Sequence, residues 1–392
     1  MSDVTVHASI KNDMNTTNIE IDIDIDIEIA LYKYYSYTAN NKQNLDPEPD
    51  AELVKELLKG PRADSITIKD IDRRLARIRG SRDQLRKLRA MPQVEQRSPE
   101  WYAMRQHRLT ASAISQSIGK GKFATRNALL KSKAFPEQDK VFDSYKCAPL
   151  RHGIMLEDMT ARCYTQRRNN VRVHSFGMIP HPTLSCFGAS PDGINDLGIM
   201  IEIKTPYSRK VGGAVPNEYM LQMQGQMAVC GLHECDFVDA EITMSPNIDE
   251  YLREVQAGAE TDHGIIVEYF NAFSERLFDY SPPNMTPQQC FQWGMEKKKE
   301  RIAEHGVNNV LLLQTWRLIK LHVERVLFDK SLWDSLVPGI EAFWADVIAM
   351  REGRLQLPEP IQHRPRTKKT LDIDIDQGEK KTDYAFVDSD ED

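Results

Sequence analysis

The sequence predicts an α/β fold in which a central mixed sheet is flanked by helices. Patterns typical of strands cluster at 171–179, 184–205 and 235–244, and helical patterns stand on both sides of this cluster. Strands that are grouped together and bracketed by helices are typical of an α/β core. The 392 residues are 41% apolar, which is enough for one large domain or two ordinary ones.

Residues 1–50 are interpreted as a low-complexity, weakly ordered segment. Residues 20–29 read EIDIDIDIEI, a strict alternation that predicts a short appended strand, and a similar LDIDID tract recurs at 371–376. The sequence NNKQNLDPEPDAE then reads as a linker. Residues 51–92 are basic and helical, and we expect them to form either a solvated pair of helices or a surface that contacts DNA.

A core domain is expected over residues 93–356. Residues 357–392, which carry the basic run HRPRTKKT and an acidic end, are predicted to form a disordered tail. The basic run would be either a nuclear-targeting patch or a solvated segment. Within the core, the spacing of apolar residues predicts helices at 101–118, 153–168, 216–230, 286–305, 308–328 and 332–352.

The sequence argues against a membrane span, a signal peptide and a zinc ribbon, and its charges are unevenly distributed. No run of about 18 apolar residues is present, so we expect no membrane span, and the N-terminus lacks the pattern of a signal peptide. The six cysteines form no CxxC pair, which argues against a zinc ribbon and fits a reducing, intracellular compartment. The net charge is −7, but residues 101–230 hold 17 Lys and Arg against 9 Asp and Glu, so this segment could bind phosphate.

The stretch FGASPDGINDLGIMIEIKTP, residues 187–206, places charges among apolar residues. The two-residue period of a strand puts Glu202 and Lys204 on one side and isoleucines on the other. The SPDG turn brings Asp192 to the end of the preceding strand, beside them. Two neighbouring carboxylates repel each other, and a divalent cation removes that repulsion, with oxygen ligands favouring Mg²⁺ or Mn²⁺. The alternative is a turn aspartate next to an exposed Glu–Lys pair.

This stretch resembles the PD-(D/E)xK nuclease motif, and its surroundings resemble the phage lambda-type exonucleases, also called YqaJ-like viral recombinases. The resemblance spans about residues 93–350, and it extends to versions carried by large DNA viruses. It implies a restriction-endonuclease-like core, to which this chain adds helical segments at its N- and C-terminal ends. The further segments that carry it are QRSPEWYAMRQHRLTAS (96–112), LRHGIMLEDMTARCY (150–164), EYMLQMQGQMAV (218–229) and LWDSLVPGIEAFWADVI (332–348).

The resemblance implies a set of catalytic residues. Asp192, Glu202 and the backbone carbonyl of Ile203 would bind metal, and Lys204 would activate or position the attacking water. Glu157 would help to hold a second ion. Two Mg²⁺ ions are therefore expected, with Mn²⁺ as a substitute.

A glutamine helix follows the motif, and the resemblance assigns Gln222 to orient the lysine or the water. Gln222 shares one helix face with Tyr219 and Gln226. The alternative is a polar stripe on a half-exposed helix.

The resemblance also implies a pocket for a terminal 5′-phosphate, formed by Arg105, Ser112 and Ser190. A guanidinium fork flanked by hydroxyl groups suits phosphate chemistry. Arg108 is expected to be an additional contact to the DNA backbone, and Trp101 to be a packing residue.

The function predicted from these features is a Mg²⁺-dependent 5′→3′ exonuclease that degrades one strand of duplex DNA from 5′-phosphorylated ends. Its 3′ single strands would serve recombination, repair or replication, with a single-strand annealing protein as a possible partner. The basic loop at 119–146 would approach the duplex end or remain solvated. A structure-selective endonuclease or an RNA-cleaving alkaline nuclease would use the same catalytic residues, and a non-catalytic protein that binds DNA ends is the third alternative. The resemblance implies a trimer, which the terminal additions leave open, and a viral version would act in the host cytoplasm or nucleus.

Overall fold

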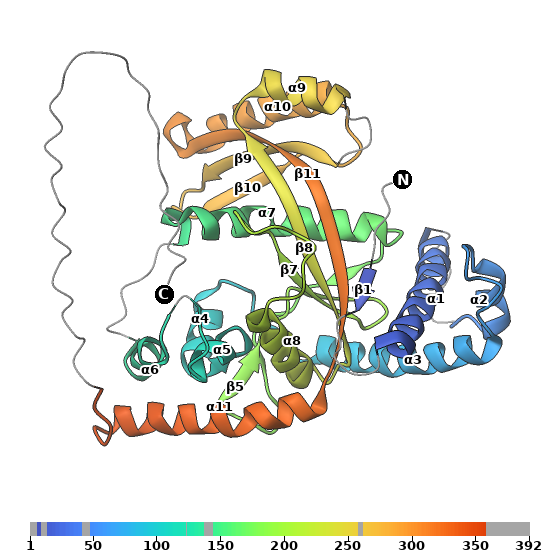
Figure 1. The fold of residues 1–392 in the computed structure, drawn as a ribbon. Helices are drawn as coiled ribbons and strands as arrows, with labels where there is room; N and C mark the ends of the chain where they lie inside the picture. Colours follow the sequence, from blue (N-terminus) through green and yellow to red (C-terminus); the bar gives the residue numbers. More distant parts are fainter. Residues whose placement is uncertain are drawn as a thin grey trace, which may run out of the picture. The chain divides into compact units, whose positions relative to one another are not determined.

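A mixed sheet of eight strands forms the centre of the computed structural model, which describes residues 6–8, 14–40, 48–122, 124–136, 144–257 and 262–357. The strand order is β10-β9-β11-β8-β7-β6-β3, and β1 pairs with β11. Figure 1 shows β1 beside the long strand β11. β7 is parallel to β8, whereas β11 is antiparallel to both β8 and β9. The strands of this sheet are β1 (Val6–Ala8), β3 (Val173–His174), β6 (Gly193–Asn195), β7 (Met200–Lys204), β8 (Glu234–Ser245), β9 (His263–Phe270), β10 (Arg276–Tyr280) and β11 (Val310–Leu327).

Two helices cover opposite faces of this sheet near its middle. On one face, α7 (Ala148–Arg167) packs Met155 and Met159 against Ala240 of β8. On the other face, α8 (Asn217–Cys230) stacks Tyr219 on Phe237 of β8, with ring centroids 5.8 Å apart. Positions 237 and 240 point to opposite sides because side chains alternate along a strand. The predicted α/β class, a mixed sheet flanked by helices, is confirmed.

The remaining elements surround this core, and residues up to Leu355 form one compact unit. A second, three-stranded sheet consists of β2 (Leu109–Thr110), β5 (Phe187–Ala189) and β4 (Ile179–Pro180). The other α-helices are α1 (Met14–Asn40), α2 (Ala51–Leu57), α3 (Ile68–Ala90), α4 (Pro99–Gln106), α5 (Ile114–Ser117), α6 (Arg126–Ala134), α9 (Ile248–Ala257), α10 (Pro287–His305) and α11 (Lys330–Arg351), and short 3₁₀ turns are η1 (Ala111–Ala113), η3 (Ser144–Lys146) and η4 (Val307–Asn309).

The helix predicted at 308–328 is wrong, because these residues form the long strand β11. The register of β11 against β8 shifts between Leu318 and Lys320, which marks a bulge. Leu318 is buried before the bulge, and Leu321 after it packs in the same apolar cluster. The bulge thus spaces two core-facing leucines three residues apart, which is the spacing of a helix face.

The strand predicted at 20–29 is also wrong, because these residues lie in α1. Acids four residues apart share a helix face, so the alternating tract forms acidic stripes in a helix as well as in a strand. Arginines within residues 62–77 form ion pairs with the acids of these stripes. The ion pairs are Arg73–Glu20, Arg62–Asp22, Arg77–Asp24, Arg62–Asp26 and Arg74–Glu28.

The basic extension is helical, as predicted, and consists of α2 and α3. Several arginines that the alternative interpretation assigns to DNA are instead paired with acids of α1. Arg74 is 1% exposed, so this side chain is part of the interior of the molecule.

Two further elements differ from their predicted bounds. The helix predicted at 101–118 is interrupted, because residues 109–110 leave it as β2 and pair in parallel with β5. The strand predicted at 171–179 divides into β3 and β4, which belong to different sheets. The elements α6, α9, β9 and β10 were not predicted, and α6 lies within the segment 119–146 that was expected to be a loop.

The predicted tail falls almost entirely outside the described residues, which end at 357. None of the described helices combines the length and the apolar character that a membrane span requires.

Candidate active site

The site forms where β7 extends beyond the end of its neighbour β6. Pairing between these strands reaches only as far as Gly193 opposite Ile201. Beyond that point Asp192 accepts a hydrogen bond from the backbone N–H of Ile203, at 2.7 Å. The Asp192 carboxylate therefore accepts the hydrogen bond that a further residue of β6 would otherwise accept from β7. Because the N–H and C=O of one strand residue point to the same edge, the Ile203 carbonyl also points to the Asp192 side.

Glu202 lies on the α8 face of β7 and is fully buried. Two amide groups of α8 hold it: Gln222 Nε2 donates to Oε1 at 2.7 Å, and Gln226 Nε2 donates to Oε2 at 2.8 Å. Gln226 is a further site residue whose contact the sequence interpretation did not specify. The signal for it was the four-residue spacing from Gln222, which places the two amides on one helix face.

Lys204 supplies the positive charge of the site. Its Nζ contacts Glu202 Oε1, and it lies over the ring of Tyr219, 4.9 Å from the centroid. Burial alone would lower the pKa of Lys204, but the carboxylates of Glu202 and Asp192 outweigh this effect and raise the pKa. The side chain is therefore an ammonium ion at neutral pH.

Glu157 approaches the site from α7. Its carboxylate pairs with Arg97, at 3.2 Å, and burial raises the pKa of Glu157 despite this arginine. Burial followed by the nearby Glu202 raises the pKa of Asp192 well above its usual range. Arg97 holds a left-handed backbone conformation with φ 68°. It is a second residue that the sequence interpretation missed, because only the fold brings it to Glu157.

These residues fit a hard divalent cation through carboxylate and carbonyl oxygens rather than through a closed cage. Among the described residues, no three His, Cys, Asp or Glu side chains gather closely enough to enclose an ion. Asp192, Glu202 and the Ile203 carbonyl could hold one face of an ion and leave the rest to water or phosphate, as Mg²⁺ prefers. Burial first, and then the neighbouring Glu202 carboxylate, raises the pKa of Asp192, and a cation would offset the repulsion from Glu202.

Two of the three residues assigned to a 5′-phosphate pocket, Arg105 and Ser190, meet around Trp101. The Trp101 indole donates a hydrogen bond to Ser190 Oγ, at 3.0 Å, and the Arg105 guanidinium lies 4.3 Å from the Trp101 ring centroid. Trp101 is partly buried and packs against Arg105, and its hydrogen bond to Ser190 is a polar contact that the expectation of a packing residue did not include. Burial lowers the pKa of Arg105, and no acid among the described residues forms an ion pair with it.

The other residues proposed for DNA contact stand apart from this pair. Ser112 is exposed, and its hydroxyl hydrogen-bonds to Thr110 at 3.1 Å. Arg108 is partly buried, and its Nε has no hydrogen-bond partner in the described part of the chain. The structure thus joins Arg105 and Ser190 through Trp101, but it shows no hydrogen bond from Ser112 to either of them.

The residues of the site follow the pattern of the PD-(D/E)xK motif, written here as Pro191-Asp192 and Glu202-Ile203-Lys204. Residues 100–233 match the family described as the YqaJ-like viral recombinase domain, so the resemblance drawn from the sequence is confirmed over this segment. Uncharacterized protein R354 of Acanthamoeba polyphaga mimivirus, a large DNA virus, is 23% identical over 329 residues. The alignment covers 74% of this chain and only 59% of that protein.

Solved exonuclease structures are also similar to this chain. The alkaline exonuclease LHK-Exo of Laribacter hongkongensis is 21% identical with a TM-score of 0.38, over 65% of this chain and 95% of that one. A phage-related exonuclease of Haemophilus somnus 129PT is 11% identical with a TM-score of 0.37, over 63% of this chain and 96% of that one.

Proposed function

We propose that this chain is a metal-dependent exonuclease that degrades one strand of duplex DNA in the 5′→3′ direction. The observation that carries the proposal is the position of Ser190, two residues before Asp192. Ser190 connects the Arg105–Trp101 pair with the carboxylates at the open edge of β7. A terminal phosphate bound by Arg105 would therefore lie at a fixed, short distance along the DNA strand from the ester bond that is cleaved.

The residues of the chain divide the chemistry among them. Asp192, Glu202 and the Ile203 carbonyl would hold Mg²⁺, which when bound supplies Lewis-acid stabilisation of the phosphate charge. The Lys204 ammonium would donate hydrogen bonds to the attacking water or to a phosphate oxygen. Gln222 and Gln226 fix the carboxylate that positions Lys204. Glu157, held by Arg97, would contribute to a second ion.

The proposal is tested by digestion of a linear duplex labelled separately at its two 5′ ends, with and without 5′-phosphate, in Mg²⁺. We expect mononucleotides released from the 5′ end, faster when the phosphate is present, and no cleavage of closed circles. Release of oligonucleotides from closed circles, with indifference to the 5′-phosphate, would replace this proposal with an endonuclease. Preferential cleavage of RNA would favour the alkaline nuclease alternative.

Arg105→Ala should slow digestion of 5′-phosphorylated duplex far more than digestion of 5′-hydroxyl duplex. A terminal phosphomonoester carries more negative charge than an internal diester, and the partly buried Arg105 guanidinium, which has no acidic partner among the described residues, should favour it. Loss of a charge-assisted contact of about 1.5–3 kcal/mol corresponds to a rate roughly 10- to 150-fold lower. The measurement is the initial rate on each substrate.

Arg108→Ala is the matched comparison for this experiment, since it removes a neighbouring arginine from the same segment. We expect it to slow the two substrates equally, as a contact to the DNA backbone would. If Arg105→Ala also slowed them equally, Arg105 would be a general DNA contact and the 5′-phosphate pocket would be wrong.

A further inference from the structure

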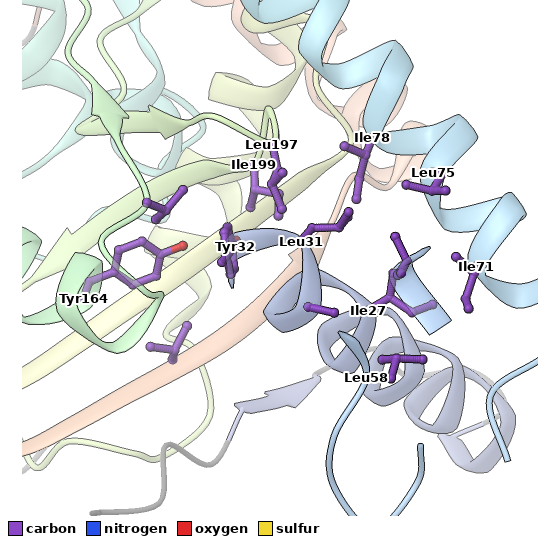
Figure 2. Close-up of a cluster of buried hydrophobic side chains, with 14 of the residues drawn as sticks. Ile27, Leu31, Tyr32, Leu58, Ile71, Leu75, Ile78, Tyr164, Leu197 and Ile199 are labelled. Atoms are coloured by element: carbon purple, nitrogen blue, oxygen red, sulfur yellow. The ribbon is translucent and has the colours of Figure 1, made fainter. Parts of the chain in front are cut away.

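The tip of the hairpin that carries the active-site carboxylates is buried beneath α1 and α3, which together we call the N-terminal extension. We define the site hairpin as residues 192–204, with its tip at 195–199. Leu197 and Ile199 of the tip are 0% and 2% exposed. They belong to one apolar cluster with residues of α1 and α3, including Leu31 and Ile78 (Figure 2). These helices lie outside the matched segment 100–233.

Asn195 closes the tip and connects it to α1. Its side-chain oxygen accepts hydrogen bonds from the backbone N–H groups of Leu197 and Ile199, at 3.0 and 3.1 Å. Its side-chain amide donates to the hydroxyl of Tyr32 on α1 at 3.0 Å, and to the hydroxyl of Tyr164 on α7 at 3.3 Å. Asn195 is fully buried, so loss of a partner would leave a polar group unsatisfied in the interior.

The backbone of α3 also lies in close contact with the tip. Gly198 has φ +79°, and a Cβ at this position would lie 2.5–2.6 Å from the backbone carbon and oxygen of Ser81. Only glycine combines this left-handed conformation with such a close approach. The tip is therefore shaped to fit against α3.

A buried ion cluster fixes α1 and α3 to the sheet. Glu28 of α1 accepts hydrogen bonds from Arg74 of α3 at 2.5 Å and from Arg325 of β11 at 2.8 Å. Arg325 also donates to Asp236 of β8, at 2.7 Å. Removal of α1 would leave these arginines buried without part of their counter-charge, which is strongly unfavourable. The extension is thus attached to β11 and β8, and β8 is the parallel neighbour of β7, the strand that carries Glu202 and Lys204.

We propose that α1 and α3 hold the site hairpin in the register that places Asp192 beside Glu202, with Tyr32 as a positioning residue. The inference rests on the proposed function for its catalytic consequence. Asp192 lies three residues before Asn195, and Glu202 lies three residues after the end of the tip. A slip of one residue in a strand moves its side chains to the opposite face, so a loosened tip would displace the carboxylates.

Tyr32→Phe tests the proposal because it removes only the hydroxyl that contacts Asn195 and keeps the ring in the apolar cluster. Deletion of the extension would be a poor test, since it would expose the buried arginines. We expect hydrogen–deuterium exchange at residues 195–203 to become about 3- to 10-fold faster, as for loss of one buried hydrogen bond. We also expect kcat to fall by a similar factor with KM for DNA ends unchanged, since small misplacements of catalytic groups reduce turnover.

Tyr35→Phe is the matched control. Tyr35 lies on the same helix, and its hydroxyl accepts a hydrogen bond from Arg82 of α3 at 2.5 Å, so the variant loosens the extension without touching the hairpin. We expect parental exchange at 195–203 and parental kcat. Equal exchange and equal kcat in the two variants would show that the extension acts only on global stability, and the proposal would be wrong.

The exchange measurement needs neither DNA nor metal, so it separates this proposal from the proposed function. Faster exchange at 195–203 in Tyr32→Phe would support the proposal that α1 positions the hairpin, even if the parental protein digests no duplex. Exchange at the parental rate in Tyr32→Phe would overturn that proposal, even if the parental protein is an active exonuclease.

Discussion

Replacing Asp192 with asparagine is expected to abolish cleavage of duplex DNA in Mg²⁺ while leaving the fold intact. Asparagine keeps the shape of the side chain, and its oxygen can still accept the hydrogen bond that Ile203 N–H donates to Asp192, at 2.7 Å. It loses the charge that makes a carboxylate a ligand for Mg²⁺. Metal ions contribute several kcal/mol to the stabilisation of developing charge, and about 4 kcal/mol corresponds to a rate about 10³-fold lower.

The free energy of unfolding shows whether this loss of activity comes from the site or from the fold. Burial and Glu202 raise the pKa of Asp192 well above its usual range, so an ionised Asp192 opposes folding when no metal is bound. Asparagine cannot ionise. We therefore expect Asp192→Asn to unfold in urea at a concentration equal to or higher than that of the parental protein at neutral pH.

Asp196→Asn is the control for the aspartate substitution. Asp196 belongs to the same hairpin, but its carboxylate contacts His174, at 2.6 Å, on the side away from Ile203. We expect this variant to digest duplex at nearly the parental rate. Near-parental turnover by Asp192→Asn in Mg²⁺ would exclude Asp192 as a metal ligand.

The parts of the site that the sequence predicted depend on local geometry. The two-residue period of β7 put Glu202 and Lys204 on the face opposite Ile203, and the structure shows this arrangement. The turn residues around Asp192 likewise predicted that it would arrive beside this strand. Over such short distances the chain has few alternatives, so residue spacing is enough to locate the carboxylates.

The parts that could not be predicted depend on contacts between distant residues. The hydrogen bond from Trp101 to Ser190 joins positions 89 residues apart, and no local pattern marks Trp101 as anything other than an apolar residue. Arg97 reaches Glu157 across 60 residues in the same way. Polar contacts of this kind require the fold before they can be recognised.

The errors in secondary structure have the same origin. The isoleucine–acid alternation at 20–29 fits a strand or a helix equally well, and only the arginines of α3 and β11 decide for the helix. In β11 the bulge near Lys320 gave apolar residues the spacing of a helix, and only the pairing with β8 and β9 shows that the segment is a strand. Tertiary contacts overrode the local pattern in each case.

Lys204→Ala is expected to reduce turnover by about 10²- to 10⁴-fold, the range that a group acting on proton transfer or on developing charge contributes. The substitution should have a smaller effect on metal binding, because Asp192 and the Ile203 carbonyl remain. The ammonium group contacts Glu202 and lies over the Tyr219 ring. Its removal would leave Glu202 with the amides of Gln222 and Gln226 as partners, so we expect the protein to remain folded.

Lys204→Arg separates a specific role of the ammonium from a general need for positive charge. The planar guanidinium is larger and spreads its charge over three nitrogens, so it cannot reproduce a compact donor between a carboxylate and an aromatic ring. We expect turnover close to that of Lys204→Ala, whereas Lys210→Ala, an exposed lysine in the following loop, should digest duplex at the parental rate. The measurements are single-turnover rates in saturating Mg²⁺ together with calorimetric titration of the metal. If Lys204→Arg kept most of the parental rate, Lys204 would act only as a cation beside Glu202, and the activation or positioning of water would have to be assigned to another group.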